Sequence, residues 1–203
     1  VGEHVIVLSP TQDESEVHRF YQTIDVLTHC SKIGEAFGNT LNEAMYWKRP
    51  VIINSTPRKD NGQLEQIDHM QTGIIANFPQ SFAHAVVYLY DRPEERKRMG
   101  ENGRAKVTTQ YSPERVTRQL EKACVELLVK KDIPVSKEIQ DVYASIAYDP
   151  SKEAILSYKD TYKKRLRESF GALRGIGYAV NMLRMPKKIF WKGKDFLEDK
   201  GIL

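Results

Sequence analysis

Residues 34–45 of this chain read Gly34-Glu35-Ala36-Phe37-Gly38-Asn39-Thr40-Leu41-Asn42-Glu43-Ala44-Met45. The stretch places two carboxylates, Glu35 and Glu43, eight positions apart on either side of a glycine-containing turn. Asn and Thr are preferred caps for the first turn of a helix, so we predict that a helix begins at about Asn39 with Asn39 or Thr40 as its cap. The N–H groups and the positive dipole end of such a helix suit an anion, and a diphosphate fits this arrangement well.

Apolar runs and helical patterns alternate on both sides of this junction. We expect buried strands at about 4–9, 26–30, 51–54 and 73–76, and helices at about 17–24, 39–47, 81–90, 94–109 and 113–128. Strands that alternate with helices imply right-handed crossovers and a parallel sheet. The predicted fold class is therefore α/β, with a Rossmann-like parallel sheet flanked by helices. Ligands of such sheets bind beyond the carboxyl ends of the strands, at the loops that start at Ser9, Ser31 and Asn54.

Charge divides the chain into two unequal parts. The net charge at pH 7 is +4 over 203 residues. Residues 1–149 carry 18 basic and 21 acidic side chains, whereas residues 150–203 carry 13 basic and 6 acidic ones. Charges and Pro134 interrupt the helical pattern after residue 130. We predict an α/β domain over residues 1–130 and a basic amphipathic helical extension over residues 131–203, with a helix from about 151 to 185.

Two interpretations of this basic extension remain open. Its apolar positions recur at three- and four-residue steps, and Phe190-Trp191 stands between lysines, which is typical of a helix that lies on an anionic membrane surface. Packing of the extension back onto the body of the protein, with its charges solvated, is the alternative that we favour. Nucleic acid is not an expected partner, because the body is acidic and no module with interleaved stacking aromatics is visible.

Three blocks of sequence carry a resemblance to a known family. They are Asp25-Val26-Leu27-Thr28-His29-Cys30-Ser31, the Glu35 and Glu43 motifs quoted above, and Lys48-Arg49-Pro50-Val51-Ile52. In this order and spacing they resemble the C-terminal donor-binding domain of retaining GT-B glycosyltransferases, family 4-like, also called group 1. The resemblance covers residues from about 5 to 128. It implies that residues 1–130 are an N-terminally incomplete Rossmann-like domain that binds a nucleotide sugar.

The resemblance assigns roles to the opening motif. It implies that Glu35 is catalytic and contacts the donor sugar near its reacting carbon, and that Glu43 binds the ribose hydroxyls of the nucleotide. The backbone after the Phe-Gly pair would hold the diphosphate, which involves Phe37, Gly38, Asn39, Thr40 and Leu41. The blander interpretations are a capping acid for Glu35 and a solvated helix carboxylate for Glu43.

Three further positions are candidates with open alternatives. Asn61 belongs to an Asp-Asn-x-Gln-x-Glu stretch that resembles a variant of a ligand-binding loop of the family, and the alternative is a polar turn. Ser9, at the end of the first expected strand, is a candidate to lie near the base. His29 either points into the donor cleft or is a strand histidine whose hydrogen bonds are satisfied inside the protein.

Metal and cofactor motifs are absent from the sequence. No Asp-x-Asp occurs, the histidines show no ligand spacing, and Cys30 and Cys124 show no metal or redox spacing. We therefore expect no metal and no cofactor, with a nucleoside-diphosphate sugar as the donor substrate. No apolar run of about 18 residues is present, so we expect a cytoplasmic protein. If the basic extension lies on a membrane, we expect peripheral contact at the inner face of that membrane.

The resemblance implies a sugar transfer to an acceptor hydroxyl, on a glycan or a lipid-linked acceptor, with retention of configuration. Whole enzymes of this kind also have an N-terminal acceptor-binding domain and further strands that carry an Arg and a Lys aimed at the diphosphate. This sequence contains neither, so we expect the chain alone to be an inactive fragment. The alternative is a non-catalytic GT-B-derived subunit that binds a nucleotide or docks on a membrane or partner.

Overall fold

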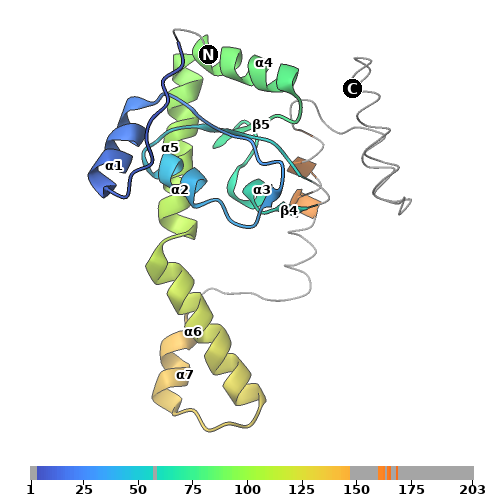
Figure 1. Cartoon of the computed structure of the whole chain (residues 1–203). Coiled ribbons are helices and arrows are strands. Elements are labelled where there is room, and N and C mark those ends of the chain that lie inside the picture. The colour runs from blue at the N-terminus through green and yellow to red at the C-terminus, as the bar shows by residue number, and fades with distance from the viewer. Residues whose placement is uncertain (1–3, 57–58, 147–159, 163, 166–167, 169–203) are drawn as a thin grey trace.

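The computed structural model of the chain describes residues 4–56, 59–146, 160–162, 164–165 and 168. Two small parallel sheets and helices α1 to α7 form this part of the molecule (Figure 1). The strands are β1 (Leu27–His29), β2 (Gly34–Glu35), β3 (Val51–Ile53), β4 (Asp60–Asn61) and β5 (Gly73–Ile75). The helices are α1 (Glu14–Thr23), α2 (Asn39–Tyr46), α3 (Gln63–Gln66), α4 (Pro79–Tyr90), α5 (Pro93–Gln110), α6 (Pro113–Lys130) and α7 (Lys137–Ala144).

The main sheet has the order β1-β3-β5, and all its pairings are parallel. Leu27 lies opposite Val51, and Val51 lies opposite Gly73. Each strand is joined to the next through at least one helix, as parallel pairing requires. The predicted α/β fold with a Rossmann-like parallel sheet flanked by helices is confirmed.

The central strand β3 separates two cores, because successive side chains point to opposite faces of a sheet. Val51 and Ile53 pack with residues of α1, α2 and α3 on one face, and Ile52 packs with residues of α4 and α5 on the other. All three side chains are fully buried. A strand covered on both faces is expected to be continuously apolar, which explains why Val51-Ile52-Ile53 shows no polar alternation.

Helix α5 packs closely against α2 and the turn after it, so that only glycine fits at Gly100 and little room is left at Gly103. A Cβ at Gly100 would lie 2.1 Å from the carbonyl oxygen of Lys48, and one at Gly103 would lie 3.1 Å from the Met45 side chain. Lys48 itself turns the chain out of α2 with a positive φ of 59°. The glycines of α5 therefore allow α2 to pack closely between the sheet and α5. Leu41, Ala44 and Met45 of α2 are fully buried there.

One predicted element is wrong. The expected strand over residues 4–9 is irregular, and its apolar side chains from Val5 to Leu8 are between 58% and 85% exposed. An apolar run becomes a strand only where a neighbouring strand supplies ladder hydrogen bonds. Within the described residues β1 pairs with β3 alone, so residues 4–9 do not extend this edge of the sheet.

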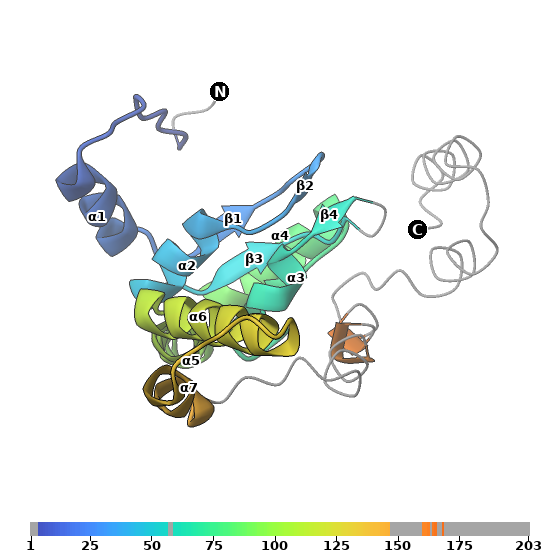
Figure 2. The ribbon, with the colours of Figure 1, turned by 90° about the horizontal axis from the view of Figure 1, so that it is seen from below.

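The described parts beyond the sheet domain are mostly helical. Ser112 caps α6 as an N-cap that accepts from the Arg115 N–H, and α7 packs beside α6 through Tyr143, whose hydroxyl donates to Glu121 at 3.0 Å (Figures 1 and 2). The expected helix over 151–185 is described only at residues 160–162, 164–165 and 168, which are helical. The rest of that helix lies outside the described residues, and the domain boundary at 130 stays a prediction. None of the described helices has the length and apolar character needed to cross a membrane.

The contact at Gly100 generates a stability prediction. Alanine has the better helix propensity by about 1 kcal/mol, but its Cβ would overlap the Lys48 carbonyl, and overpacking costs about 1–3 kcal/mol. We expect Gly100→Ala to lower the free energy of unfolding, measured by urea denaturation. Lys97→Ala, an exposed position on the same helix, is the control and should leave it nearly unchanged. A Gly100→Ala variant at least as stable as the parent would contradict the packing argument.

Candidate functional site

Two loops meet at the carboxyl edge of the main sheet. The amide of Asn54, just after β3, grips the backbone of Ser31, just after β1: Oδ1 accepts from the Ser31 N–H at 2.9 Å and Nδ2 donates to its carbonyl at 3.0 Å. Farther out, β2 and β4 pair in parallel and extend beyond the main sheet (Figure 2). The Gly62 N–H donates to the Glu35 carbonyl at 2.6 Å, and a Cβ at Gly62 would lie 1.9 Å from the Ala36 carbonyl oxygen. Glu35 is therefore fixed on a short ribbon at the rim of the sheet.

Helix α2 starts at this rim without a side-chain cap from the described residues. Its N-cap is Gly38, so the prediction of Asn39 or Thr40 as the cap is wrong. The buried amide of Gln66 holds Gly38 instead, because Oε1 accepts from its N–H and Nε2 donates to its carbonyl, each at 3.0 Å. A side chain from α3 does here what a local cap does elsewhere.

This arrangement leaves two backbone donors at the start of α2. The Gly38 N–H is bonded to Gln66, and the Leu41 N–H is bonded to the Gly38 carbonyl at 3.0 Å. The N–H groups of Asn39 and Thr40 donate to no other described residue, and the first turn of α2 contains no acidic side chain. Free N–H groups and an uncompensated positive dipole end attract an anion. The side chain of Leu41 is fully buried, so only its backbone remains available to a ligand.

Glu35 lies beside a histidine of β1. Nε2 of His29 is 3.4 Å from Oε2 of Glu35, and both side chains are about a quarter exposed, at 26% and 27%. This nitrogen is shielded from solvent and makes no hydrogen bond within the described residues. The interpretation of His29 as a strand histidine with satisfied hydrogen bonds does not agree with this unbonded nitrogen. The ring faces the carboxylate of Glu35 instead.

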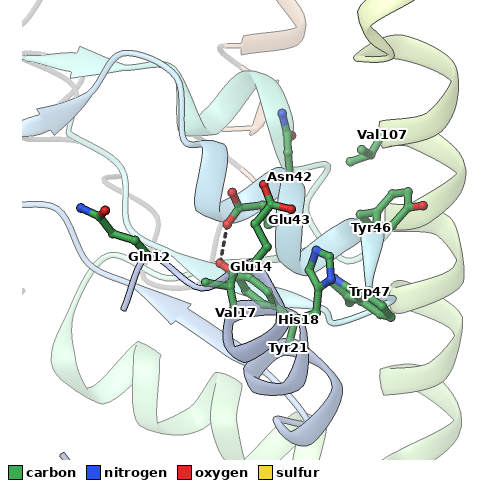
Figure 3. A pocket seen from close by; sticks show the side chains of 10 residues that line it. All are labelled: Gln12, Glu14, Val17, His18, Tyr21, Asn42, Glu43, Tyr46, Trp47 and Val107. Carbon is green, nitrogen blue, oxygen red and sulfur yellow. Dashed lines mark hydrogen bonds between the residues drawn. The ribbon is translucent and has the colours of Figure 1, made fainter. Parts of the chain in front are cut away.

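Glu43 projects from the second turn of α2 toward α1. The hydroxyl of Tyr21 donates to Oε2 of Glu43 at 2.8 Å, shown as a dashed line in Figure 3. Burial of the ring, together with this hydrogen bond, raises the pKa of the Tyr21 hydroxyl, which stays a protonated donor at neutral pH. The Glu43 carboxylate is on the wall of an open pocket of about 500 Å³ between α1 and α2, whose other walls include the rings of His18 and Trp47, which contact each other at a tilt of 53° (Figure 3).

The other candidate ligand-binding residues are Phe37, Asn61 and Ser9. Phe37 is 47% exposed and packs edge-on against Tyr111 at 5.6 Å between ring centroids. Asn61 is buried in β4, where its Oδ1 accepts from the Thr56 N–H at 2.9 Å and its Nδ2 donates to the Tyr162 hydroxyl at 2.6 Å. Ser9 lies in the irregular segment before α1, so the structural reason for placing it at the sheet edge is absent. Ligand contact by Asn61 or Ser9 stays a prediction.

The start of the basic extension contacts the sheet domain. Tyr162 packs against the α1–α2–α3 core, and the guanidinium of Arg165 bonds Asp68 and the backbone carbonyls of Leu64 and Glu65 at the end of α3. The ammonium of Lys106 from α5 bonds the same Asp68 at 2.8 Å. These contacts support the packing interpretation for residues 160–168 as far as they are described. Most of the basic residues on which membrane contact was predicted lie outside the described residues.

A sequence model of one protein family matches this chain. The model of the glycosyl transferases group 1 covers residues 1–106, which include β1 to β5 and the whole rim described above. The chain belongs to the group 1 glycosyltransferases. The match confirms the family indicated by the Glu35 and Glu43 motifs.

Two curated relatives share sequence with this group 1 glycosyltransferase chain. The human alpha-1,3/1,6-mannosyltransferase is 35% identical over 131 residues, which cover 64% of this chain and 30% of the human protein. The trehalose synthase of Pyrococcus horikoshii is 33% identical over 96 residues, which cover 47% of this chain and 22% of that enzyme. The chain thus spans less than a third of each of these relatives.

Solved structures also resemble the chain. HepE of Anabaena, in complex with UDP-glucose, is 19% identical with a TM-score of 0.48, over 53% of this chain and 29% of HepE. The C-terminal domain of LpcC, a group 1 glycosyl transferase of Francisella tularensis, is 26% identical with a TM-score of 0.46, over 52% of this chain and 53% of that domain.

Sequence reasoning missed three side chains that shape this site: Tyr21, Asn54 and Gln66. Tyr21 falls within the helix expected at about 17–24, and a buried tyrosine hydroxyl generally needs a partner, which is a usable signal. Asn54 and Gln66 carry no comparable signal, because an amide beside a strand or in a short helix is commonplace.

Among the described residues no group of three or more His, Cys, Asp or Glu side chains could hold a metal ion. Metal independence stays a prediction.

The Gln66 amide generates a second stability prediction. Gln66→Leu keeps the side chain about the same size but leaves the buried N–H of Gly38 without its partner, and an unsatisfied buried donor costs about 1–3 kcal/mol. The carbonyl of Gly38 still accepts from the N–H groups of Leu41 and Asn42. We expect urea denaturation to show a loss of about 1–3 kcal/mol. Gln140→Leu is the matched control, because that glutamine also bonds a backbone carbonyl, Val135 at 2.9 Å, but from a half-buried position on the mostly exposed α7. Equal effects of the two substitutions would contradict the capping role of Gln66.

Proposed function

We propose that this chain is the donor-binding part of a glycosyltransferase that moves a sugar from a nucleoside-diphosphate sugar to an acceptor hydroxyl with retention of configuration. One observation carries the proposal: the start of α2, where the N–H groups of Asn39 and Thr40 donate to no other described residue, lies between Glu35 on β2 and Glu43 on α2, at the carboxyl edge of a parallel sheet. Membership in the group 1 glycosyltransferases and the relationship to a mannosyltransferase support it.

The diphosphate binds at the start of α2 in this proposal. The N–H groups of Asn39 and Thr40 donate to phosphate oxygens, and the helix dipole stabilises the negative charge that grows on the leaving group as the glycosidic bond breaks. These donors are held in place before the substrate arrives, because Gln66 and the packed α5 fix the position of the helix. Preorganised dipoles need little reorientation during the reaction, which is the source of their catalytic effect.

The two carboxylates have separate tasks. Glu35 contacts the donor sugar near its reacting carbon and favours the positive charge of an oxocarbenium-like transition state by its own negative charge. Glu43 accepts hydrogen bonds from the ribose hydroxyls. We assign no covalent step to Glu35. The acceptor hydroxyl, on a glycan or a lipid-linked molecule, belongs to the proposal and not to any residue described above.

Nucleotide titration tests the binding half of the proposal. We expect the longest natural polypeptide that contains this chain to bind one of UDP, GDP, ADP and CDP saturably in isothermal titration calorimetry. Glu43→Ala should weaken that binding at least about tenfold, because a hydrogen bond to a charged group contributes about 1.5–3 kcal/mol. Glu121→Ala, which removes a tyrosine-bonded glutamate remote from the site, is the control. A folded protein that binds none of the four nucleotides would favour the non-catalytic interpretation.

Turnover tests the catalytic half. Glu35→Gln keeps the size of the side chain and removes its charge, so we expect turnover of the same polypeptide to fall at least about a hundredfold while nucleotide binding and thermal unfolding change little. Glu126→Gln, which neutralises a surface acid 3.7 Å from Lys122, should leave turnover unchanged. Wild-type turnover in Glu35→Gln would remove Glu35 from the mechanism and leave the nucleotide site intact.

A further inference from the structure

The contact between Tyr21 and Glu43 joins a buried residue to an exposed one. Tyr21 is only 4% exposed and belongs to the core between α1, α2 and β3, whereas Glu43 is an exposed residue of α2. Surface glutamates usually sample several rotamers, and holding one in place costs side-chain entropy. The buried Tyr21 hydroxyl donates to one carboxylate oxygen of Glu43, Oε2, at 2.8 Å. It does not bond the other oxygen, Oε1. The carboxylate is therefore oriented by a rigid neighbour while one of its oxygens stays available.

Tyr21 is itself anchored from its backbone side. The guanidinium of Arg49, in the turn after α2, donates to the carbonyl of Tyr21 at 2.7 Å and to that of Gln22 at 2.6 Å. These carbonyls are among the last of α1, which have no partner within the helix. The ring of Phe20 lies edge-on to that of Tyr21, at 5.2 Å between centroids. Arg49, Tyr21 and Glu43 thus form a closed link from the end of α2 through α1 and back to the middle of α2.

The chemistry of the link suits a neutral hydroxyl ligand. A lysine or arginine in place of Tyr21 would neutralise Glu43 and compete with a ligand for it, whereas a tyrosine hydroxyl donates one hydrogen bond and leaves the carboxylate its charge. A carboxylate oxygen that keeps its charge and a fixed direction is a strong acceptor for a diol, and a pre-oriented acceptor loses less entropy on binding.

We propose that Tyr21 is a positioning residue, which holds the Glu43 carboxylate in the orientation that receives the ribose hydroxyls of the nucleotide. The inference rests on the proposed function. It adds a residue from α1, outside the motifs of residues 34–45, and it makes nucleotide recognition depend on the docking of α1 against α2.

Ribose selectivity provides a test that a purely structural role of Tyr21 would not affect. The measured quantity is the ratio of two dissociation constants, for the 2′,3′-dideoxy analogue and for the nucleoside diphosphate that binds best among UDP, GDP, ADP and CDP. Isothermal titration calorimetry of the longest natural polypeptide containing this chain supplies both. We expect Tyr21→Phe to weaken binding of the natural nucleotide about tenfold and to leave the dideoxy analogue unaffected, so that the ratio falls about tenfold.

The controls separate positioning from folding. Tyr143→Phe removes the same kind of tyrosine–glutamate bond, Tyr143 to Glu121, between α7 and α6 and should leave the ratio unchanged. Tyr21→Phe added to Glu43→Ala should have no further effect, because the tyrosine acts through the carboxylate. Arg49→Gln loosens Tyr21 but keeps both side chains of the contact, and it should lower the ratio even if the phenylalanine variant does not fold.

The outcomes are distinct. One outcome would overturn the role of Tyr21 and leave the proposed function standing. The ratio would keep its wild-type value in folded Tyr21→Phe and in Arg49→Gln, while Glu43→Ala would bring it to about one. A wild-type protein that binds the nucleotide and its dideoxy analogue equally would overturn the ribose role of Glu43 and the inference together. A ratio lowered in both variants and unchanged in Tyr143→Phe supports the inference.

Discussion

The site depends on where α2 begins, and one buried amide decides it. Gln66 satisfies both the N–H and the carbonyl of Gly38, and it also donates to Asn42 at 2.8 Å in the first turn of the helix. With Gly38 fixed as the N-cap, the N–H groups of Asn39 and Thr40 point out of the helix end. Glu43 follows one turn after the start and faces α1. A shift of this start by one residue would rotate Glu43 by about 100° about the helix axis.

Rigid parts of the fold carry the rim residues. The fully buried β3 and the close contact of α5 with α2 hold the frame, and the loops after β1 and β3 are tied to each other through Asn54 and Gly62. Functional residues on loops generally need such a scaffold. Each carboxylate then has a partner from a different element: Glu35 faces His29 of β1, and Glu43 faces Tyr21 of α1.

Local pattern predicted the elements that bury many apolar side chains. β3, β5 and helices α2, α4, α5 and α6 appear close to their expected positions, because the period of their apolar residues is a property of adjacent sequence. The same reasoning produced a strand at residues 4–9, since an apolar run says nothing of which strand would pair with it. The ribbon of β2 and β4 was not predicted, because two-residue strands of mixed polarity have no period to detect.

Local residue patterns predicted the alternation of strands and helices, the family, and two acids on either side of a helix start. The groups that hold those acids and that helix start follow from how the elements pack. Tyr21 bonds a residue 22 positions away, Gln66 bonds one 28 positions away, and Asn61 bonds one 101 positions away. A hydrogen bond across such a separation depends on atomic distances and angles that arise only when the elements pack, so no stretch of neighbouring residues encodes it.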